Sequence, residues 1–280
     1  MKTICEALGL ARSTFWRYYH KGNISPTRRL APCRLKIKEK VRALALKYPT
    51  YGYRRIWGHL RREGIFISKK TVEATMKDLG LLQPIKRCLA KRKAKGIVIR
   101  PVRSNQVWQS DLTKVWTGRD GWSYLFAVLD VYDRRTIWAD LFLRCRDKEA
   151  LSTLSEALNA AFPEGAKDKG LVLIHDNGSQ FTSRRYQLFC QELGIKSVRT
   201  SYRHPETIGA IERFFGTVKE EEVWRKDYES YEEARSSILL YIQWYNAERI
   251  HSALGYKTPL EAYKDSLEGL AKREPILVSF

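Results

Sequence analysis

The sequence predicts an α/β protein in which a mixed β-sheet with flanking helices is preceded by all-α segments. Three observations support this. After residue 105, strand and helix patterns follow each other in the order βββαβαβα. The first hundred residues instead carry helix start and stop signals, and the excess of positive charge is confined to that part. A chain of 280 residues has room for more than one domain.

The charge is divided unevenly along the chain. The whole sequence has a formal net charge of +20, and residues 1–104 carry 27 Lys and Arg against 5 Asp and Glu. The remainder is therefore slightly acidic, at −2. Such a basic segment favours a polyanionic partner, above all double-stranded DNA, over a small-molecule substrate.

The cysteines and the hydropathy exclude other classes of protein. The 5 cysteines are far apart and have no zinc-ligand spacing, so we expect free thiols in a reducing cytoplasm. No apolar run approaches the length of a membrane helix, and we expect no membrane partner.

Two helix-turn-helix-like segments are predicted in the basic part. In residues 1–48, a helix over 3–8 ends at Gly9, and Ser13 caps a second helix that runs to Gly22. In residues 49–82, a helix from Tyr53 to Arg62 is followed by a turn at Gly64 and a helix capped by Ser68. A basic linker is expected over 83–104.

Basic residues on the polar face of the second helix pair are the predicted DNA contacts. They are Arg54, Arg55, Arg61, Arg62, Lys69 and Lys70.

The catalytic part is predicted over residues 105–265, with a tail at 266–280. Aromatic and β-branched residues indicate strands at 106–116, 123–132 and 136–144. A helix at 148–162 precedes a short apolar strand at 171–174, a helix at 184–193, a strand at 196–200 and a helix from about 208. This order is that of a ribonuclease H-like mixed sheet, completed here by C-terminal helices.

Three carboxylates fall at informative places in this order. Asp111 lies within the first strand, Asp176 directly follows the buried strand, and Glu212 lies on a helix face opposite its apolar residues. Converging carboxylates suit two Mg²⁺ or Mn²⁺ ions, which bind oxygen ligands and act on phosphodiesters. Thr113 faces the same side of its strand as Asp111. Taken singly, each acid also fits a turn or a solvated helix, so the prediction rests on their conjunction with Lys219, two turns after Glu212.

The chain resembles insertion-sequence transposases with a retroviral-integrase-type (DDE) catalytic core, the second-reading-frame product of two-frame bacterial elements. The resemblance extends from about Tyr51 to Tyr263. Its motifs are YGYRRIWGHLRREG, KKTVEATMKDLGL, WQSDLT, DNGSQF, HPETIGAIERFFGTVK and YNAERIHSALGYKTPLEAY.

The resemblance implies metal ligation by Asp111, Asp176 and Glu212, and a phosphate contact from Lys219. It also implies a homo-multimer on DNA and, in such elements, frequent fusion to an upstream reading frame. Two positions depart from the family: His175 stands where Ser or Thr is common, and Ile208 where Asn is common. Ile208 raises the prospect of weaker capping of the helix that carries Glu212.

Three functions are therefore weighed. The first is a DNA transposase that binds element ends and catalyses metal-dependent cleavage and strand transfer. The second is a ribonuclease H-like nuclease, which leaves the helix-turn-helix segments unexplained. The third is a catalytically impaired, element-derived DNA-binding regulator.

Overall fold

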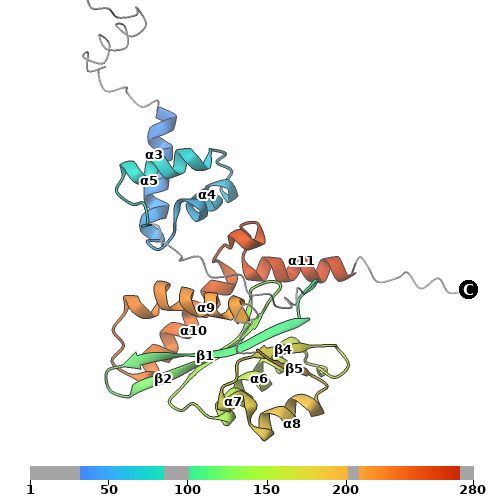
Figure 1. The fold of residues 1–280 in the computed structure, drawn as a ribbon. Helices are drawn as coiled ribbons and strands as arrows, with labels where there is room; N and C mark the ends of the chain where they lie inside the picture. The colour runs from blue at the N-terminus through green and yellow to red at the C-terminus, as the bar shows by residue number, and fades with distance from the viewer. Residues whose placement is uncertain (1–31, 85–100, 201–207, 272–280) are drawn as a thin grey trace, which may run out of the picture.

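The computed structural model describes residues 32–84, 101–200 and 208–271, which form a helical unit and an α/β core (Figure 1). The helices predicted within residues 3–22 and most of the predicted linker lie outside these residues.

Three helices form the N-terminal unit: α3 (Pro32–Lys47), α4 (Tyr53–Arg62) and α5 (Lys69–Asp78). The predicted pair, α4 and α5, is confirmed, and the Ser68 hydroxyl accepts a hydrogen bond from the Thr71 amide (3.1 Å). Helix α3 was not predicted. Its buried positions recur at helical spacing, but they stand among many basic residues that obscure the pattern. The shared core includes Val41, Ile56 and Met76.

The core is a five-stranded sheet in the order β3-β2-β1-β4-β5. Its strands are β1 (Val107–Thr117), β2 (Gly121–Asp130), β3 (Thr136–Phe142), β4 (Val172–His175) and β5 (Lys196–Arg199). Strands β1, β2 and β3 form the predicted antiparallel meander, whereas β4 and β5 run parallel to β1. The predicted mixed sheet and its element order are confirmed.

Helices cover both faces of the sheet (Figure 1). One face packs on α6 (Asp147–Ala161) and α8 (Arg184–Glu192). The short helix α7 (Ser179–Thr182) follows β4 in the chain and precedes α8. The other packs on α9 (Gly209–Glu221) and α10 (Tyr231–Ala247). The short 3-10 turns η2 (Val223–Arg225) and η3 (Ser252–Leu254) follow these two helices, and α11 (Pro259–Ala271) ends the described chain.

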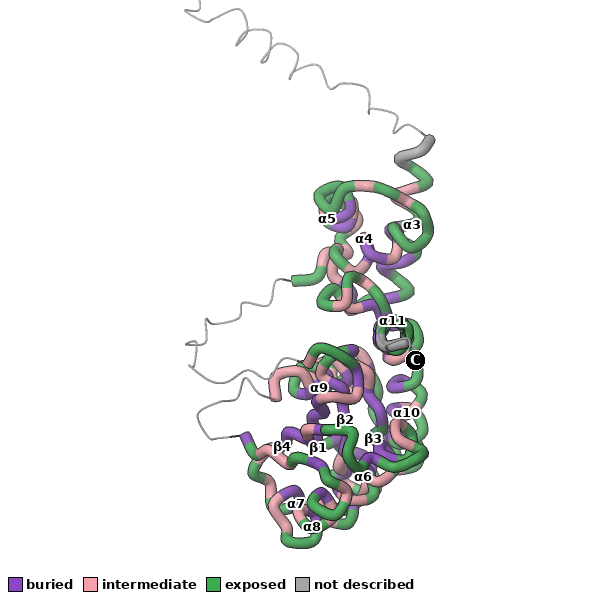
Figure 2. The backbone as a smooth tube through the Cα atoms, turned by 90° about the vertical axis from the view of Figure 1, so that its right-hand side faces the viewer, coloured by how far each residue is buried: buried purple, intermediate pink, exposed green. Residues whose placement is uncertain are grey.

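Alternation along β1 decides which side chains face α9. Trp108 belongs to the hydrophobic cluster on the α6 and α8 side, whereas Val115 belongs to the cluster on the α9 and α10 side. Because successive strand residues point to opposite faces, Gln109 and Asp111 face the α9 side with Val115. Figure 2 shows the central strands largely in the colour of buried residues.

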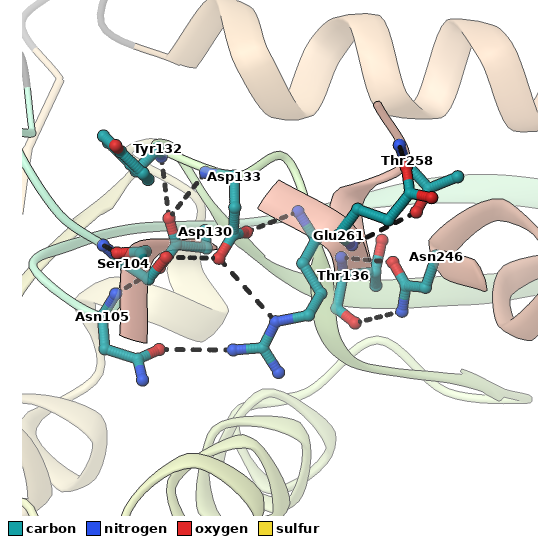
Figure 3. Close-up of polar contacts among 11 residues, drawn as sticks. Ser104, Asn105, Asp130, Tyr132, Asp133, Thr136, Asn246, Thr258 and Glu261 are labelled. Atoms are coloured by element: carbon teal, nitrogen blue, oxygen red, sulfur yellow. Dashed lines mark hydrogen bonds and ion pairs between the residues drawn. The ribbon is translucent and has the colours of Figure 1, made fainter. Parts of the chain in front are cut away.

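Polar bonds fix the start of β1 to the β2–β3 turn (Figure 3). The buried Asp130 accepts from the Asn105 amide, and the buried Asp133 accepts from the Ser104 hydroxyl (2.7 Å). Burial, followed by repulsion from Asp133, raises the pKa of Asp130 to about 7. These carboxylates shape a turn that holds Arg134 at a positive φ of 62°.

The helical unit contacts the core through α4. Arg62 forms two hydrogen bonds to Glu261 of α11 (2.7 and 2.6 Å), and Arg55 pairs with Glu221 of α9 (3.3 Å). Gly58 permits close packing, because a Cβ there would lie 2.5 Å from Tyr256 Cδ1. In the parts that the structure describes, no helix is long and apolar enough to span a membrane.

Candidate active site

The parallel pairing of β1 and β4 brings Asp111 and Asp176 together. Ser110 is paired with His175, so Asp111, the next residue of β1, lies beside Asp176, the first residue after β4. The Leu112 amide donates to Asp111 Oδ1 (2.8 Å), and the Gly178 amide donates to Asp176 Oδ1 (2.9 Å). The Asp-Asn-Gly turn therefore holds Asp176 at the carboxyl end of β4.

The charges of three predicted site residues act on a fourth, the carboxyl group of Asp111. The pKa of Asp111 is raised to about 7, first by burial and then by the negative charges of Asp176 and Glu212. The Leu112 hydrogen bond and the positive charge of Lys219 act in the opposite direction. The structure thus brings Asp176, Glu212 and Lys219 each within electrostatic range of Asp111.

His175 has a structural role beside the site. Its ring is fully buried and stacks on Phe181. Nδ1 lies 2.7 Å from the Asp176 carbonyl, and Nε2 lies 2.9 Å from Ser197 Oγ. Since a carbonyl only accepts, Nδ1 carries the proton and Nε2 accepts from the hydroxyl. Burial lowers the pKa of His175, so this neutral ring joins β4 to β5 next to Asp176.

The N-terminus of helix α9 is capped by a side chain of strand β1. Ile208 supplies no side-chain cap, as its residue type dictates. Instead the Ile211 amide donates to Gln109 Oε1 of β1 (2.9 Å). Gln109 is buried and lies two residues before Asp111 on the same strand face. It therefore joins the strand of Asp111 to the first turn of the helix that carries Glu212.

Glu212 and Lys219 lie away from the apolar face of α9. Ile211, Phe214 and Val218 are buried against the sheet and α10, while the Glu212 side chain is exposed and that of Lys219 is half-buried. This is the arrangement that the helical spacing predicts.

The carboxylates do not form a ready coordination sphere. Within the described ranges, no group of three or more His, Cys, Asp or Glu side chains is placed to hold a metal ion. The donor chemistry nevertheless suits a hard divalent cation, since all three side chains offer oxygen and their repulsion raises the pKa of Asp111.

The predicted DNA contacts of the helical unit differ in their surroundings. Arg55 and Arg62 are engaged in the ion pairs with Glu221 and Glu261 that join the unit to the core. Arg61 lies over the ring of Trp57 (5.1 Å), and Lys69 lies over the same ring (4.4 Å). Exposed side chains at this surface include Arg54 and Lys70.

Sequence reasoning missed a buried ion-pair network beneath α9. Glu221 Oε1 accepts from Arg249 Nη2 (2.7 Å), and Oε2 accepts from Arg249 Nε and from the Tyr241 hydroxyl (2.8 Å each). Burial alone would raise the pKa of Glu221, but the Arg249 hydrogen bonds bring it below its usual value. Arg55 and His251 adjoin this network. No local pattern predicts it, because Arg55 and Glu221 are 166 residues apart.

Comparison with known proteins places both parts of the chain. Models of the integrase core domain match residues 101–205 and 193–259, and a model of an HTH-like domain matches residues 32–88. The transposase for insertion sequence element IS904 of Lactococcus lactis is 30% identical over 241 residues, which are 81% of this chain and 93% of that protein. The transposase for insertion sequence element IS629 of Shigella sonnei is 29% identical and covers 93% of this chain and 90% of its own length.

A solved structure shares the fold. The intasome of simian T-cell lymphotropic virus, determined in complex with PP2A regulatory subunit B56 gamma, aligns with a TM-score of 0.51. The alignment covers 86% of this chain and 77% of that chain at 17% identity.

Proposed function

The chain belongs to the family of insertion-sequence transposases with an integrase-type core, and from this premise we propose that Asp111, Asp176 and Glu212 form a metal-dependent catalytic centre. The observation that carries the proposal is the parallel pairing of β1 with β4, which sets Asp111 beside Asp176, together with the Gln109–Ile211 hydrogen bond that joins β1 to the first turn of the helix with Glu212. The effect of the Asp176 and Glu212 charges on the pKa of Asp111 supports the same grouping.

Two Mg²⁺ or Mn²⁺ ions held by this donor set would supply Lewis acidity toward the scissile phosphodiester and its attacking hydroxyl. The side chains of the triad must first turn toward one another, because they do not surround a common point. The exposed Glu212 has the freedom to do so. Its backbone remains fixed, because Gln109 holds the first turn of α9.

Other residues of this chain would position the DNA. Lys219 carries a positive charge close to Asp111 and is suited to hold a phosphate next to the reacting one. Thr113 is buried on the same face of β1 and supports the strand rather than the substrate. The basic HTH-like unit would bind double-stranded DNA at the element ends, with Arg54 and Lys70 on its exposed surface.

The reaction that follows is cleavage of a phosphodiester bond at each element end and joining of the freed 3′-hydroxyl to target DNA. Because two ends must be handled together, we propose a homo-multimer of this chain on DNA.

The test compares single substitutions in the triad with a matched control. Asp111→Asn, Asp176→Asn and Glu212→Gln remove a charge with little change of shape, and Glu156→Gln does the same at an exposed site on α6. Each protein is incubated with Mg²⁺ or Mn²⁺ and labelled duplex that carries candidate element ends. We expect nicks and joined products from the parent and from Glu156→Gln, and none from the triad variants, all of which bind duplex.

The products also separate the alternatives. Cleavage by the Glu212→Gln protein would overturn the role of that residue. Hybrid-specific cleavage of RNA would indicate the nuclease, and duplex binding without products from the parent would indicate the regulator.

A further inference from the structure

A cavity of about 200 Å³ lies beside α9, next to the face that carries Glu212. Its walls come from helix α4, the β2–β3 turn, α9 and the stretch from the end of α10 to η3. Each of these four parts supplies an arginine. The arginines are Arg55, Arg134, Arg213 and Arg249.

Direct ion pairs account for only part of the positive charge in this arginine cavity. Glu221 is shared, because it accepts from Arg249 (2.7 Å) and also pairs with Arg55 (3.3 Å). Among the described residues, no carboxylate lies within ion-pair distance of Arg134 or Arg213. Asp130 and Asp133 attract Arg134 from a greater distance, so four guanidinium groups line a space in which Glu221 is the carboxylate that pairs directly with them. Uncompensated charge that is partly removed from water is costly, so the cavity favours an anion.

The neighbouring titratable groups respond to the guanidinium charges. Burial, with repulsion from Arg249, lowers the pKa of Arg55, and burial with repulsion from Arg213 lowers that of Arg134. His251 also lines the cavity, and its pKa falls to about 3 through burial and the charges of Arg249, Arg55 and Arg134. The imidazole therefore adds no charge at neutral pH.

We propose that the arginine cavity binds a phosphate group of the DNA backbone, with Arg134 and Arg213 as its main ligands. Guanidinium groups match phosphate oxygens in paired hydrogen bonds, and four of them converge on this space. The assignment of this phosphate to DNA rests on the proposed function. In that function, DNA crosses α9 at Glu212, one residue before Arg213. A strand that leaves the active site along α9 passes over the cavity.

The DNA backbone suits this cavity better than an isolated small anion does. Water occupies roughly 30 Å³ per molecule in the liquid, so a cavity of about 200 Å³ has room for a tetrahedral phosphate with some of its hydration. Duplex DNA carries one negative charge per about 1.7 Å of helix axis, and screening acts over about 8–10 Å. Phosphates on either side of the bound one would therefore also interact with the four guanidinium groups.

The test uses the full chain and variants that spare the buried network. Arg134 has a positive φ of 62°, which Asn tolerates, so it is replaced in Arg134→Asn. Arg213→Ala removes an exposed side chain from helix α9. Arg213→Lys keeps the charge. The matched control is Arg184→Ala, which removes an exposed arginine from α8 on the other side of the sheet.

Duplex affinity is measured at several salt concentrations without Mg²⁺, so binding is observed apart from cleavage. Each phosphate contact contributes about 0.9 to the slope of log affinity against log salt. We expect Arg134→Asn and Arg213→Ala to make the slope shallower by about that amount, whereas Arg213→Lys and Arg184→Ala retain the parental slope. Unchanged slopes for both cavity variants would overturn the proposal.

A second measurement follows the imidazole of His251 by NMR, with duplex or with inorganic phosphate at constant ionic strength. Duplex should raise the pKa of His251, because a bound anion offsets the guanidinium charges. If inorganic phosphate raises the pKa of His251 and duplex does not, the cavity binds a free anion and the DNA assignment is overturned. Because no step requires turnover, a parent that binds through the cavity and yields no products leaves this inference intact and overturns the proposed function.

Discussion

Replacing Glu221 by Gln tests how far the buried ion pair joins α9 to the segment after α10. The side chains of Glu221 and Arg249 are only 7% and 2% exposed, and two short hydrogen bonds join them. Removing one partner of such a pair leaves the other charge buried, which typically costs about 3–5 kcal/mol. Gln retains one acceptor, so we expect Glu221→Gln to lower the free energy of unfolding by about 3 kcal/mol.

Glu261→Gln is the matched control, because Arg62 binds Glu261 with the same two-bond geometry near the surface. The side chains of that pair are 41% and 40% exposed, so screening should limit the cost to below about 1 kcal/mol. Equilibrium urea denaturation, followed by tryptophan fluorescence at low and high salt, gives both values. Salt should weaken the effect of Glu261→Gln and leave that of Glu221→Gln nearly unchanged. Equal losses in the two variants would refute the reasoning from burial.

Three further outcomes are expected. Gln109→Ala should cost about 1 kcal/mol and reduce strand transfer more than duplex binding, since α9 loses its cap; equal loss of binding and transfer would contradict a positioning role. Gly58→Ala should lower stability by about 1–3 kcal/mol through a clash with Tyr256, measured by thermal unfolding, whereas Gly52→Ala meets open space and should be tolerated. The His251 pKa of about 3, against 6.5 when unfolded, means that its stabilising effect is complete above pH 6.5 and is lost as pH falls toward 3. NMR should show a neutral ring at pH 5, and titration near 6.5 would contradict its burial among arginines.

Local patterns in the sequence sufficed for the elements of the core and for their order. Strands β1 to β5 and helices α6, α8 and α9 follow the predicted order, because period-two and helical spacings of apolar residues reflect burial of one face within each element. The helix cap at Ser68 could be predicted in the same way, because its hydrogen-bond partner, the Thr71 amide, is only three residues away. The positions of Asp111, Asp176 and Glu212 on a strand, after a strand and on a helix followed from the same patterns.

Tertiary structure alone decided what surrounds those acids. Ile208 suggested a weakened helix, yet Gln109, a hundred residues earlier, supplies the cap across space. The sequence likewise predicted Arg55 as a DNA contact on a polar helix face, whereas the fold pairs it with Glu221. Such partners leave no local signal, because a hydrogen bond or ion pair between distant segments depends on how whole elements pack. The arginine cavity has the same origin, since its four guanidinium groups come from parts of the chain that meet only in the folded molecule.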